Sequence, residues 1–141
     1  MTTPTPSRLL AELQHQHEKL RAMMDRCEQL ADDLDRGGAQ ASELTREVAK
    51  LRLAFDAHNR FEEQLLRPVL RDLDAFGTVR LEQMVADHVE EHRAMRQQLD
   101  GPTGELRATL YELRAHLAAE ERYFLSSHVL RDDLVTVEGG G

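Results

Sequence analysis

Residues 8–36, RLLAELQHQHEKLRAMMDRCEQLADDLDR, decide the fold. Most of them are strong helix formers, and the stretch lacks the period-two alternation of a strand. One row of side chains recurs at alternating spacings of three and four, as on a helix that buries one face in a bundle. The row consists of Leu10, Leu13, His17, Leu20, Met24, Cys27, Ala31 and Leu34. The stretch therefore predicts a long helix whose buried face includes one histidine.

Three further segments, 42–75, 79–100 and 104–133, have the same helix-forming composition. They are separated by Gly37-Gly38, by Gly77-Thr78 and by the turn sequence at 101–104. Short connections between long helices favour antiparallel neighbours, so we predict an all-α, up-down-up-down four-helix bundle over residues 8–133. Pro68 should kink the second helix near Leu65. Residues 1–7 and 134–141 are expected to be a disordered N-terminus and a flexible C-terminal tail.

Charge and composition exclude several classes of protein. The chain has 18 Lys and Arg against 26 Asp and Glu, for a net charge of −8, and its basic residues form no cluster. We therefore expect neither a nucleic-acid nor a membrane partner. Cys27 is the only cysteine, which rules out an intrachain disulfide and a thiolate metal site. The sequence predicts a soluble, acidic, cytoplasmic protein and leaves its oligomeric state open.

The inward rows of the other segments also carry polar groups. The second row is Val48, Leu51, Phe55, His58, Glu62, Leu65 and Val69, and the third is Leu81, Val85, His88, His92, Met95 and Leu99. The fourth is Leu113, His116, Glu120 and Tyr123, beside an apolar row of Leu110, Leu117 and Phe124. Five of the seven histidines and two glutamates thus occupy positions where a bundle normally has leucine. Because an unpaired buried charge costs several kcal/mol, these groups must satisfy one another or a shared ligand.

Distances from the turns place these groups at one level of the bundle. His17 and His58 lie equally far from Gly37-Gly38. The pairs His58/Glu62 and His88/His92 are about equally far from Gly77, and His88/His92 and His116/Glu120 from the turn at 101–104. In an antiparallel bundle, all four helices would therefore deliver polar groups to one layer.

The spacing within each pair favours metal binding. Residues four apart face the same way on a helix, so each pair can chelate one site. Imidazole suits Fe, Zn, Cu and Ni, and carboxylates can bridge two metal ions. Five histidines, two bridging carboxylates and a bridging oxide or hydroxide would leave two octahedral ions one ligand short. This count predicts a dinuclear site with one open position for a small ligand such as O₂.

Four segments carry a resemblance to a known family: QHEKL around His17, HNRFEE at 58–63, HVEEH at 88–92 and HLAAEE at 116–121. In this order they resemble hemerythrin and the hemerythrin-like (HHE cation-binding) domains. The resemblance implies an oxo- or hydroxo-bridged centre of two Fe ions, with Zn as a possible substitute. It also implies a ligand set of His17, His58, Glu62, His88, His92, His116 and Glu120, with Glu62 bridging.

Two ligands in that set remain open. The oxygen carriers have an acidic residue five positions after the last histidine, here Glu121, whereas HHE domains have one four positions after it, here Glu120. We favour Glu120 because it shares a helical row with His116. His88 is open because many HHE relatives use one histidine on the third helix.

Several nearby residues are expected to lie outside the metal-ligand set. His15 and His128 should be away from the site, and Glu63 and Glu121 should lie behind the ligands or face solvent. Tyr123 is either hydrogen-bonded beside the centre or an ordinary core tyrosine.

The leading functional prediction is a protein that binds O₂ or NO, for storage, delivery or sensing. Ferritin-like oxidases use four carboxylates and two histidines. A set of five neutral histidines and two carboxylates would leave more positive charge at the irons, which disfavours high-valent iron. The alternatives are catalase- or peroxidase-like decomposition of H₂O₂, a role in iron homeostasis or iron repair, and a structural bundle stapled by metal. Whether the protein is an enzyme is left open.

Overall fold

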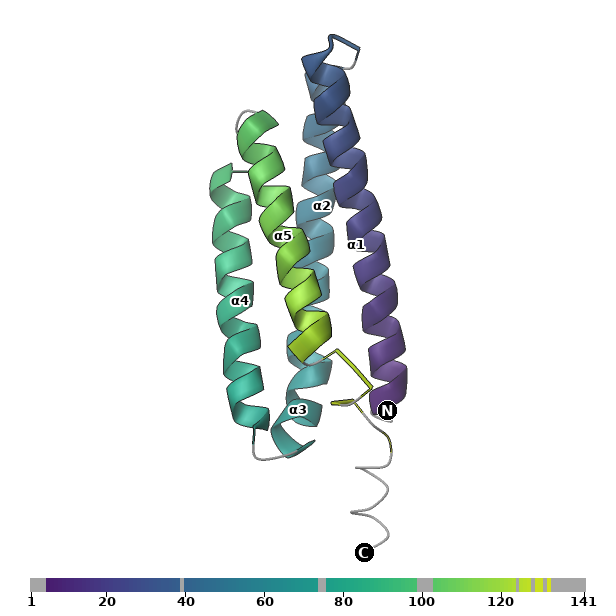
Figure 1. Ribbon diagram of the computed structural model, residues 1–141, viewed down its shortest axis with the longest axis vertical. Helices are drawn as coiled ribbons and strands as arrows, with labels where there is room; N and C mark the ends of the chain where they lie inside the picture. The colour runs from purple at the N-terminus through teal and green to yellow at the C-terminus, as the bar shows by residue number, and fades with distance from the viewer. Residues whose placement is uncertain are drawn as a thin grey trace, which may run out of the picture.

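The computed structural model describes residues 5–38, 40–73, 76–98, 103–123, 125–127, 129–130 and 132. The helices are α1 (Pro6–Asp35), α2 (Ala41–Phe61), the π-helix η1 (Glu62–Leu66), α3 (Arg67–Leu73), α4 (Gly77–Gln98) and α5 (Thr103–Tyr123). Because α2, η1 and α3 follow one another without a break, the helices form four rods that lie side by side (Figure 1). The described residues include no strand, which confirms the all-helical prediction for this part of the chain.

Local sequence fixes both ends of α1. At its start, the Thr5 hydroxyl accepts a hydrogen bond from the Arg8 backbone N–H, and Pro6 occupies the first turn. At its end, Gly37 has a φ of 78°, a left-handed conformation that glycine adopts without strain. The Gly38 N–H bonds to the Asp33 carbonyl at 2.7 Å and closes the helix. The predicted break at Gly37-Gly38 is confirmed, and α2 returns alongside α1 (Figure 1).

The second rod is irregular where the sequence predicted a kink. The π-helix η1 ends two residues before Pro68. A π-turn contains one more residue than an α-turn, so it shifts the buried row by one position. Leu66 and Leu70 are fully buried, whereas the predicted Leu65 and Val69 are only partly buried. The predicted irregularity is therefore present, but its effect on side-chain register was not foreseen.

The fourth helix is shorter than predicted. The sequence predicts that it reaches residue 133, but α5 ends at Tyr123, and residues 125–127 and 129–130 form bends and turns. Leu125 and Leu130 are each only 2% exposed, and they pack with Leu9, Leu13 and Leu66. Burial of these two leucines against the end of the bundle is the physical reason that the chain leaves the helix.

A polar layer separates two apolar clusters in the bundle. The upper cluster consists of Leu20, Met24, Cys27, Ala31, Val48, Leu51, Phe55, Met95, Leu106, Leu110, Leu113 and Leu117. The lower cluster consists of Leu9, Leu13, Leu66, Leu70, Met84, Leu125 and Leu130. His17 stands on α1 between Leu13 of the lower cluster and Leu20 of the upper one. The polar groups therefore lie between two hydrophobic regions.

Some predictions concern residues outside the described part of the chain. These are the loops at 74–75 and 99–102, His128, Phe124 and the tail from 133. At the N-terminus, α1 begins at Pro6, inside the segment expected to be disordered, and residues 1–4 are not described. No helix among the described residues is long and apolar enough to cross a membrane.

Candidate metal centre

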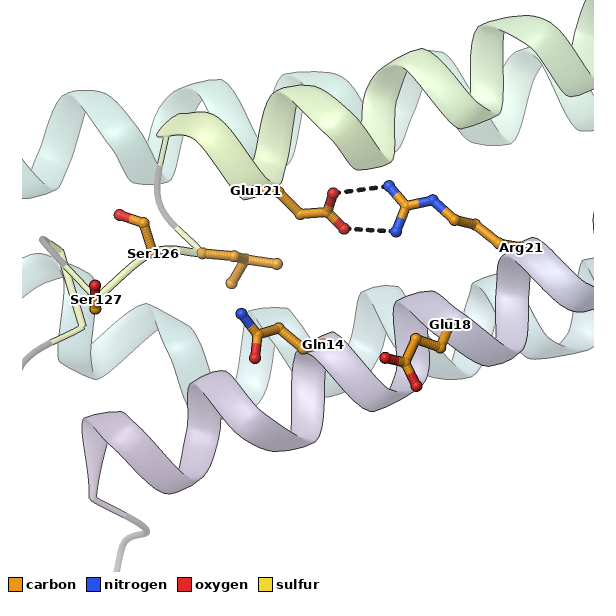
Figure 2. A pocket seen from close by; sticks show the side chains of 7 residues that line it. Gln14, Glu18, Arg21, Glu121, Ser126 and Ser127 are labelled. Carbon is orange, nitrogen blue, oxygen red and sulfur yellow. Dashed lines mark hydrogen bonds and ion pairs between the residues drawn. The ribbon is translucent and has the colours of Figure 1, made fainter.

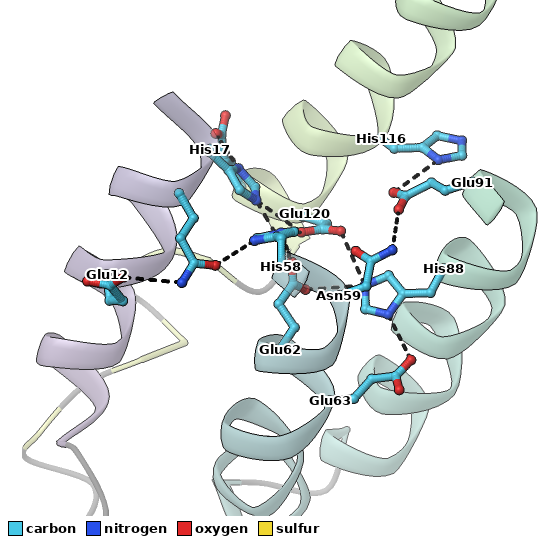
Figure 3. Close-up of polar contacts among 12 residues, drawn as sticks. Glu12, His17, His58, Asn59, Glu62, Glu63, His88, Glu91, His116 and Glu120 are labelled. Atoms are coloured by element: carbon cyan, nitrogen blue, oxygen red, sulfur yellow. Dashed lines mark hydrogen bonds and ion pairs between the residues drawn. The ribbon is translucent and has the colours of Figure 1, made fainter. Parts of the chain in front are cut away.

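Six buried side chains meet in the polar layer (Figure 3). They are His17 from α1, His58 from α2, Glu62 from η1, His88 and Glu91 from α4, and Glu120 from α5. Each is 5% exposed or less. We call these six residues the central cluster. All four rods contribute to it, as the sequence predicted.

One half of the central cluster consists of His17, His58, Glu62 and Glu120, whose candidate ligand atoms lie within 4.8 Å of one another. The His17 Nε2 atom is 3.2 Å from Glu120 Oε2 and 3.9 Å from Glu62 Oε1. His58 Nε2 contacts Glu62 Oε1 and lies 3.8 Å from Glu120 Oε2. The two imidazole rings are 4.8 Å apart, which confirms that His17 and His58 share a level.

The other half consists of His88, Glu91 and Glu120, whose ligand atoms also lie within 4.8 Å of one another. The His88 Nε2 atom is 3.5 Å from Glu62 Oε2 and 3.7 Å from Glu120 Oε1. Glu62 and Glu120 therefore each direct one oxygen toward His17 and His58 and the other toward His88. Carboxylates that bridge two metal ions have this arrangement.

Several buried atoms of the central cluster lack a hydrogen-bond partner, and they supply a test of whether metal fits. These atoms are His58 Nε2, both carboxylate oxygens of Glu62, His88 Nε2 and Glu120 Oε1. Leaving such atoms unsatisfied in a protein interior is costly. All of them belong to nitrogen and carboxylate ligands of the kind that bind divalent first-row metals. The residues present therefore fit a metal centre.

Without metal, the central cluster behaves as a network of opposite charges. Burial alone would lower the pKa of His17, but the hydrogen bond to Glu120 and the nearby carboxylate of Glu62 outweigh burial and raise it to about 10. The same competition raises the pKa of His88 to about 11. Burial would raise the pKa of Glu120, but its three imidazole partners hold it well below the usual range. Protons on the imidazoles thus supply positive charge that metal ions would replace.

His92 does not join the central cluster. Its side chain is 56% exposed, and its Nδ1 atom is 3.8 Å from Asp56 Oδ1. Its predicted place on the inward row is taken by Glu91, which is fully buried. Adjacent residues lie about 100° apart around a helix, so only one of the two can face the core. Burial of Met84, His88 and Met95 turns α4 so that Glu91 is that residue.

His116 lies at the edge of the site rather than in it. Its side chain is 26% exposed, and its Nδ1 atom is 3.3 Å from Glu91 Oε1. Leu113 and Leu117 are fully buried and set the orientation of α5. That orientation brings Glu120 inward and leaves His116 on the flank, where it contacts Glu91.

Two further residues that the sequence placed near the predicted site, Tyr123 and His15, are exposed. Tyr123 is 63% exposed with the Arg122 guanidinium 5.8 Å from its ring centroid, so neither buried interpretation of this tyrosine holds. His15 is exposed, as predicted.

Glu91 belongs to the site although the inward row predicted from the sequence does not contain it. Its two oxygens are engaged, one by the amide of Asn59 at 3.1 Å and the other by His116. The signal was present in the sequence, because Met84, His88, Glu91 and Met95 also follow spacings of four, three and four. The histidine-rich row that includes His92 has equally regular spacing.

Glu121 lies behind the central cluster, and Glu120 lies within it. Both oxygens of Glu121 accept hydrogen bonds at 2.7 Å from the Arg21 guanidinium (Figure 2). Its Oε2 atom also lies 2.9 Å from His17 Nδ1. The pair borders a surface pocket of about 600 Å³, lined by Gln14, Glu18, Arg21, Glu121, Leu125, Ser126 and Ser127. This placement agrees with our preference for Glu120 over Glu121 as the inner carboxylate.

Comparison with known proteins assigns the part of the chain that carries these residues to a family. The family model of the hemerythrin HHE cation-binding domain matches residues 8–125, which include all six residues of the central cluster. No curated protein and no solved structure shows a significant match to the chain. Because the family model covers most of the sequence, the chain belongs to the hemerythrin HHE cation-binding domain family.

Proposed function

We propose that the central cluster holds two iron ions bridged by Glu62 and Glu120. The observation that supports this is the division of the oxygens: each bridging glutamate directs one oxygen to either half of the cluster. One ion would take His17 and His58 as its further ligands, and the other His88 and Glu91. Each ion would then have four protein ligand atoms, which leaves room for a bridging oxide or hydroxide and for a small external ligand.

The ligand balance differs from the one that the sequence predicted. The central cluster has three imidazoles and three carboxylates in place of five imidazoles and two carboxylates. This set carries more negative charge than expected, although less than the four-carboxylate pattern of ferritin-like proteins. Our proposal therefore remains a protein that binds O₂ or NO at a di-iron centre, for storage, delivery or sensing.

The surroundings of the central cluster support binding of a small ligand. An iron pair would supply coordination of O₂ and exchange of electrons with it. The chain's own residues would hold the ions, and the apolar clusters on both sides, including Leu13 and Leu20, would exclude bulk water. The net charge of −8 also fits a small neutral ligand better than a nucleic acid or an anionic membrane.

Metal analysis of the full chain purified in air, together with its ultraviolet–visible spectrum, tests the proposal. We expect two irons per chain and oxo-to-iron charge-transfer absorption in the near ultraviolet. This absorption should change when the iron is reduced without O₂ and return when O₂ is admitted. One zinc per chain and no such absorption would contradict the proposal and favour the structural, metal-stapled alternative.

Decomposition of H₂O₂ is the second candidate, and Glu91 is the observation that favours it. A third buried carboxylate places additional negative charge beside the metals, which stabilises ferric iron through electrostatic attraction. Adding H₂O₂ to the iron-loaded protein separates the two candidates. Sustained O₂ release would favour the enzyme, whereas bleaching without release would favour the carrier.

A further inference from the structure

The three imidazoles of the central cluster are each held at the nitrogen that faces away from its centre (Figure 3). His17 Nδ1 lies 2.9 Å from Glu121 Oε2, and His88 Nδ1 lies 3.0 Å from Glu63 Oε1. The third of these contacts joins His58 Nδ1 to the side-chain oxygen of Gln16 at 2.8 Å. In all three cases Nε2 is the nitrogen near the bridging carboxylates.

These outer partners share a simple sequence pattern: each is adjacent in the chain to a residue of the central cluster. Glu63 follows Glu62, Glu121 follows Glu120, and Gln16 precedes His17. Within each pair, one side chain reaches the centre and its neighbour reaches the outer nitrogen of a histidine on another helix. Gln16 on α1 thus holds His58 on α2, Glu63 on η1 holds His88 on α4, and Glu121 on α5 holds His17 on α1.

We infer that Gln16, Glu63 and Glu121 are positioning residues that fix the three imidazoles for metal binding through Nε2. The inference rests on the proposed function, because it assigns roles around the same metal centre. A carboxylate oxygen and an amide oxygen can only accept a hydrogen bond, so Nδ1 must donate. When Nδ1 carries the proton of a neutral imidazole, the lone pair of Nε2 is free to bind metal.

The three outer partners differ in charge and in the contacts that hold them in place. Gln16 is neutral, whereas Glu63 and Glu121 are carboxylates that increase electron donation by the imidazole they hold. Glu121 is itself held by both terminal nitrogens of Arg21, which fixes its orientation. The side chains of Glu63 and Glu121 are 37% and 31% exposed, so either can be replaced without opening the core.

Zinc titration of the metal-free full chain tests the inference, with Zn²⁺ as the probe. The variants are Glu63→Leu and Glu121→Leu, the conservative change Glu63→Gln, and the control Glu82→Leu at an exposed position on α4. We expect Glu63→Leu and Glu121→Leu to weaken zinc binding by about 10- to 100-fold, as is typical when the partner of a metal-bound histidine is lost. Glu63→Gln should retain most of the affinity because its oxygen can still accept, and Glu82→Leu should match the parent.

Nuclear magnetic resonance of the histidine side chains supplies a readout that a merely structural role would not change. In the zinc-loaded parent, His88 should show a slowly exchanging Nδ1 proton with Nε2 bound to metal, and this proton should exchange faster in Glu63→Leu. The inference is overturned if Glu63→Leu and Glu121→Leu bind zinc as tightly as the parent does. It is also overturned if they lose affinity only in proportion to a loss of helicity or stability of the metal-free chain. Failure of the parent itself to bind metal would instead refute the proposed function.

Discussion

At the scale of single residues, the central cluster depends on two carboxylates whose two oxygens face different halves of the cluster. Glu62 and Glu120 are both almost fully buried, and each divides its oxygens between the two halves of the cluster. Two cations a few ångströms apart repel strongly in a medium of low dielectric constant. A bridging anion offsets that repulsion, so the charge of these glutamates matters more than their size.

Glu62→Gln should therefore cost the protein one or both metal ions. The substitution keeps the shape of the side chain but removes one bridging negative charge. Metal per chain should fall by at least half, with loss of the near-ultraviolet absorption and retention of the helices. The matched control is Glu63→Gln, where the hydrogen bond to His88 can be kept, and it should hold nearly the full complement. Equal metal loss in the two variants would mean that the wrong glutamate has been assigned as the bridge.

Replacing each of the two histidines of α4 with alanine should have very different effects on the metal content of the protein. His88→Ala removes an Nε2 atom that lies near the carboxylates of Glu62 and Glu120, so metal content should fall by about one ion per chain. His92→Ala changes an exposed side chain and should leave metal content unchanged. Elemental analysis of the two purified variants measures the metal content of each. Greater metal loss in His92→Ala would show that α4 is rotated by about 100° from the position described here.

The sequence predicted five of the six residues of the central cluster, and α4 shows why the prediction was incomplete. His88 and Met95 belong to two possible rows, one through Glu91 and one through His92, and both have helical spacing. Periodicity cannot separate two rows that both contain His88 and Met95 and both have helical spacing. The burial of Met84 decides between them, and that burial depends on packing against Leu66 and Leu70.

At the scale of helices, the π-turn and the end of α5 shape the lower half of the molecule. The extra residue in η1 shifts burial to Leu66 and Leu70, just below Glu62. Pro68 predicts an irregularity in the second rod, but the sequence does not show that this irregularity is a π-turn rather than a kink. The end of α5 cannot be predicted from the sequence for a related reason: no glycine or proline follows Tyr123 before residue 139 to mark the end of a helix.

The segment after α5 should contribute measurably to stability. Leu130 is 2% exposed in the lower cluster, so Leu130→Ala should lower the free energy of unfolding by about 2–4 kcal/mol. Leu53→Ala is the matched control, because Leu53 is 71% exposed and its loss should change stability by about 0.5 kcal/mol or less. Urea denaturation of the metal-free variants provides the comparison. Similar values for the two variants would mean that the segment does not pack on the bundle.

The chain after α5 also caps the N-terminus of α1. Asp132 accepts hydrogen bonds from the backbone N–H of Ser7 at 2.9 Å and from its hydroxyl at 2.6 Å. A carboxylate at a helix N-terminus satisfies an N–H that has no partner within the helix and interacts favourably with the helix dipole. Asp132→Ala should therefore lower the free energy of unfolding slightly. Amide exchange at Ser7 should become faster, and unchanged exchange there would argue against the contact.

At the scale of the whole molecule, the bundle consists of two apolar clusters joined through a charged layer. Ion pairs between α5 and α1, such as those of Arg114 with Asp25 and Glu28, lie outside this layer and are partly exposed. Exposed pairs of this kind contribute little to stability. The buried layer matters more, because a bound metal ion would supply the partner that its buried nitrogen and oxygen atoms lack.

Removal of metal should lower the stability of the whole bundle. A ligand present at about a thousand times its dissociation constant stabilises the folded state by about 4 kcal/mol. We therefore expect a chelator to lower the midpoint of thermal unfolding by about 10 °C and re-addition of metal to restore it. In Glu62→Gln, the same treatment should change the midpoint much less. An equal shift in the parent and in Glu62→Gln would place the stabilising metal elsewhere.

The most direct test of the central claim is a crystal structure of the iron-loaded chain with anomalous diffraction recorded at the iron absorption edge. We predict two separate iron peaks between Glu62 and Glu120, one beside His17 and His58 and the other beside His88 and Glu91. A single peak, or a peak ligated by His92, would contradict it.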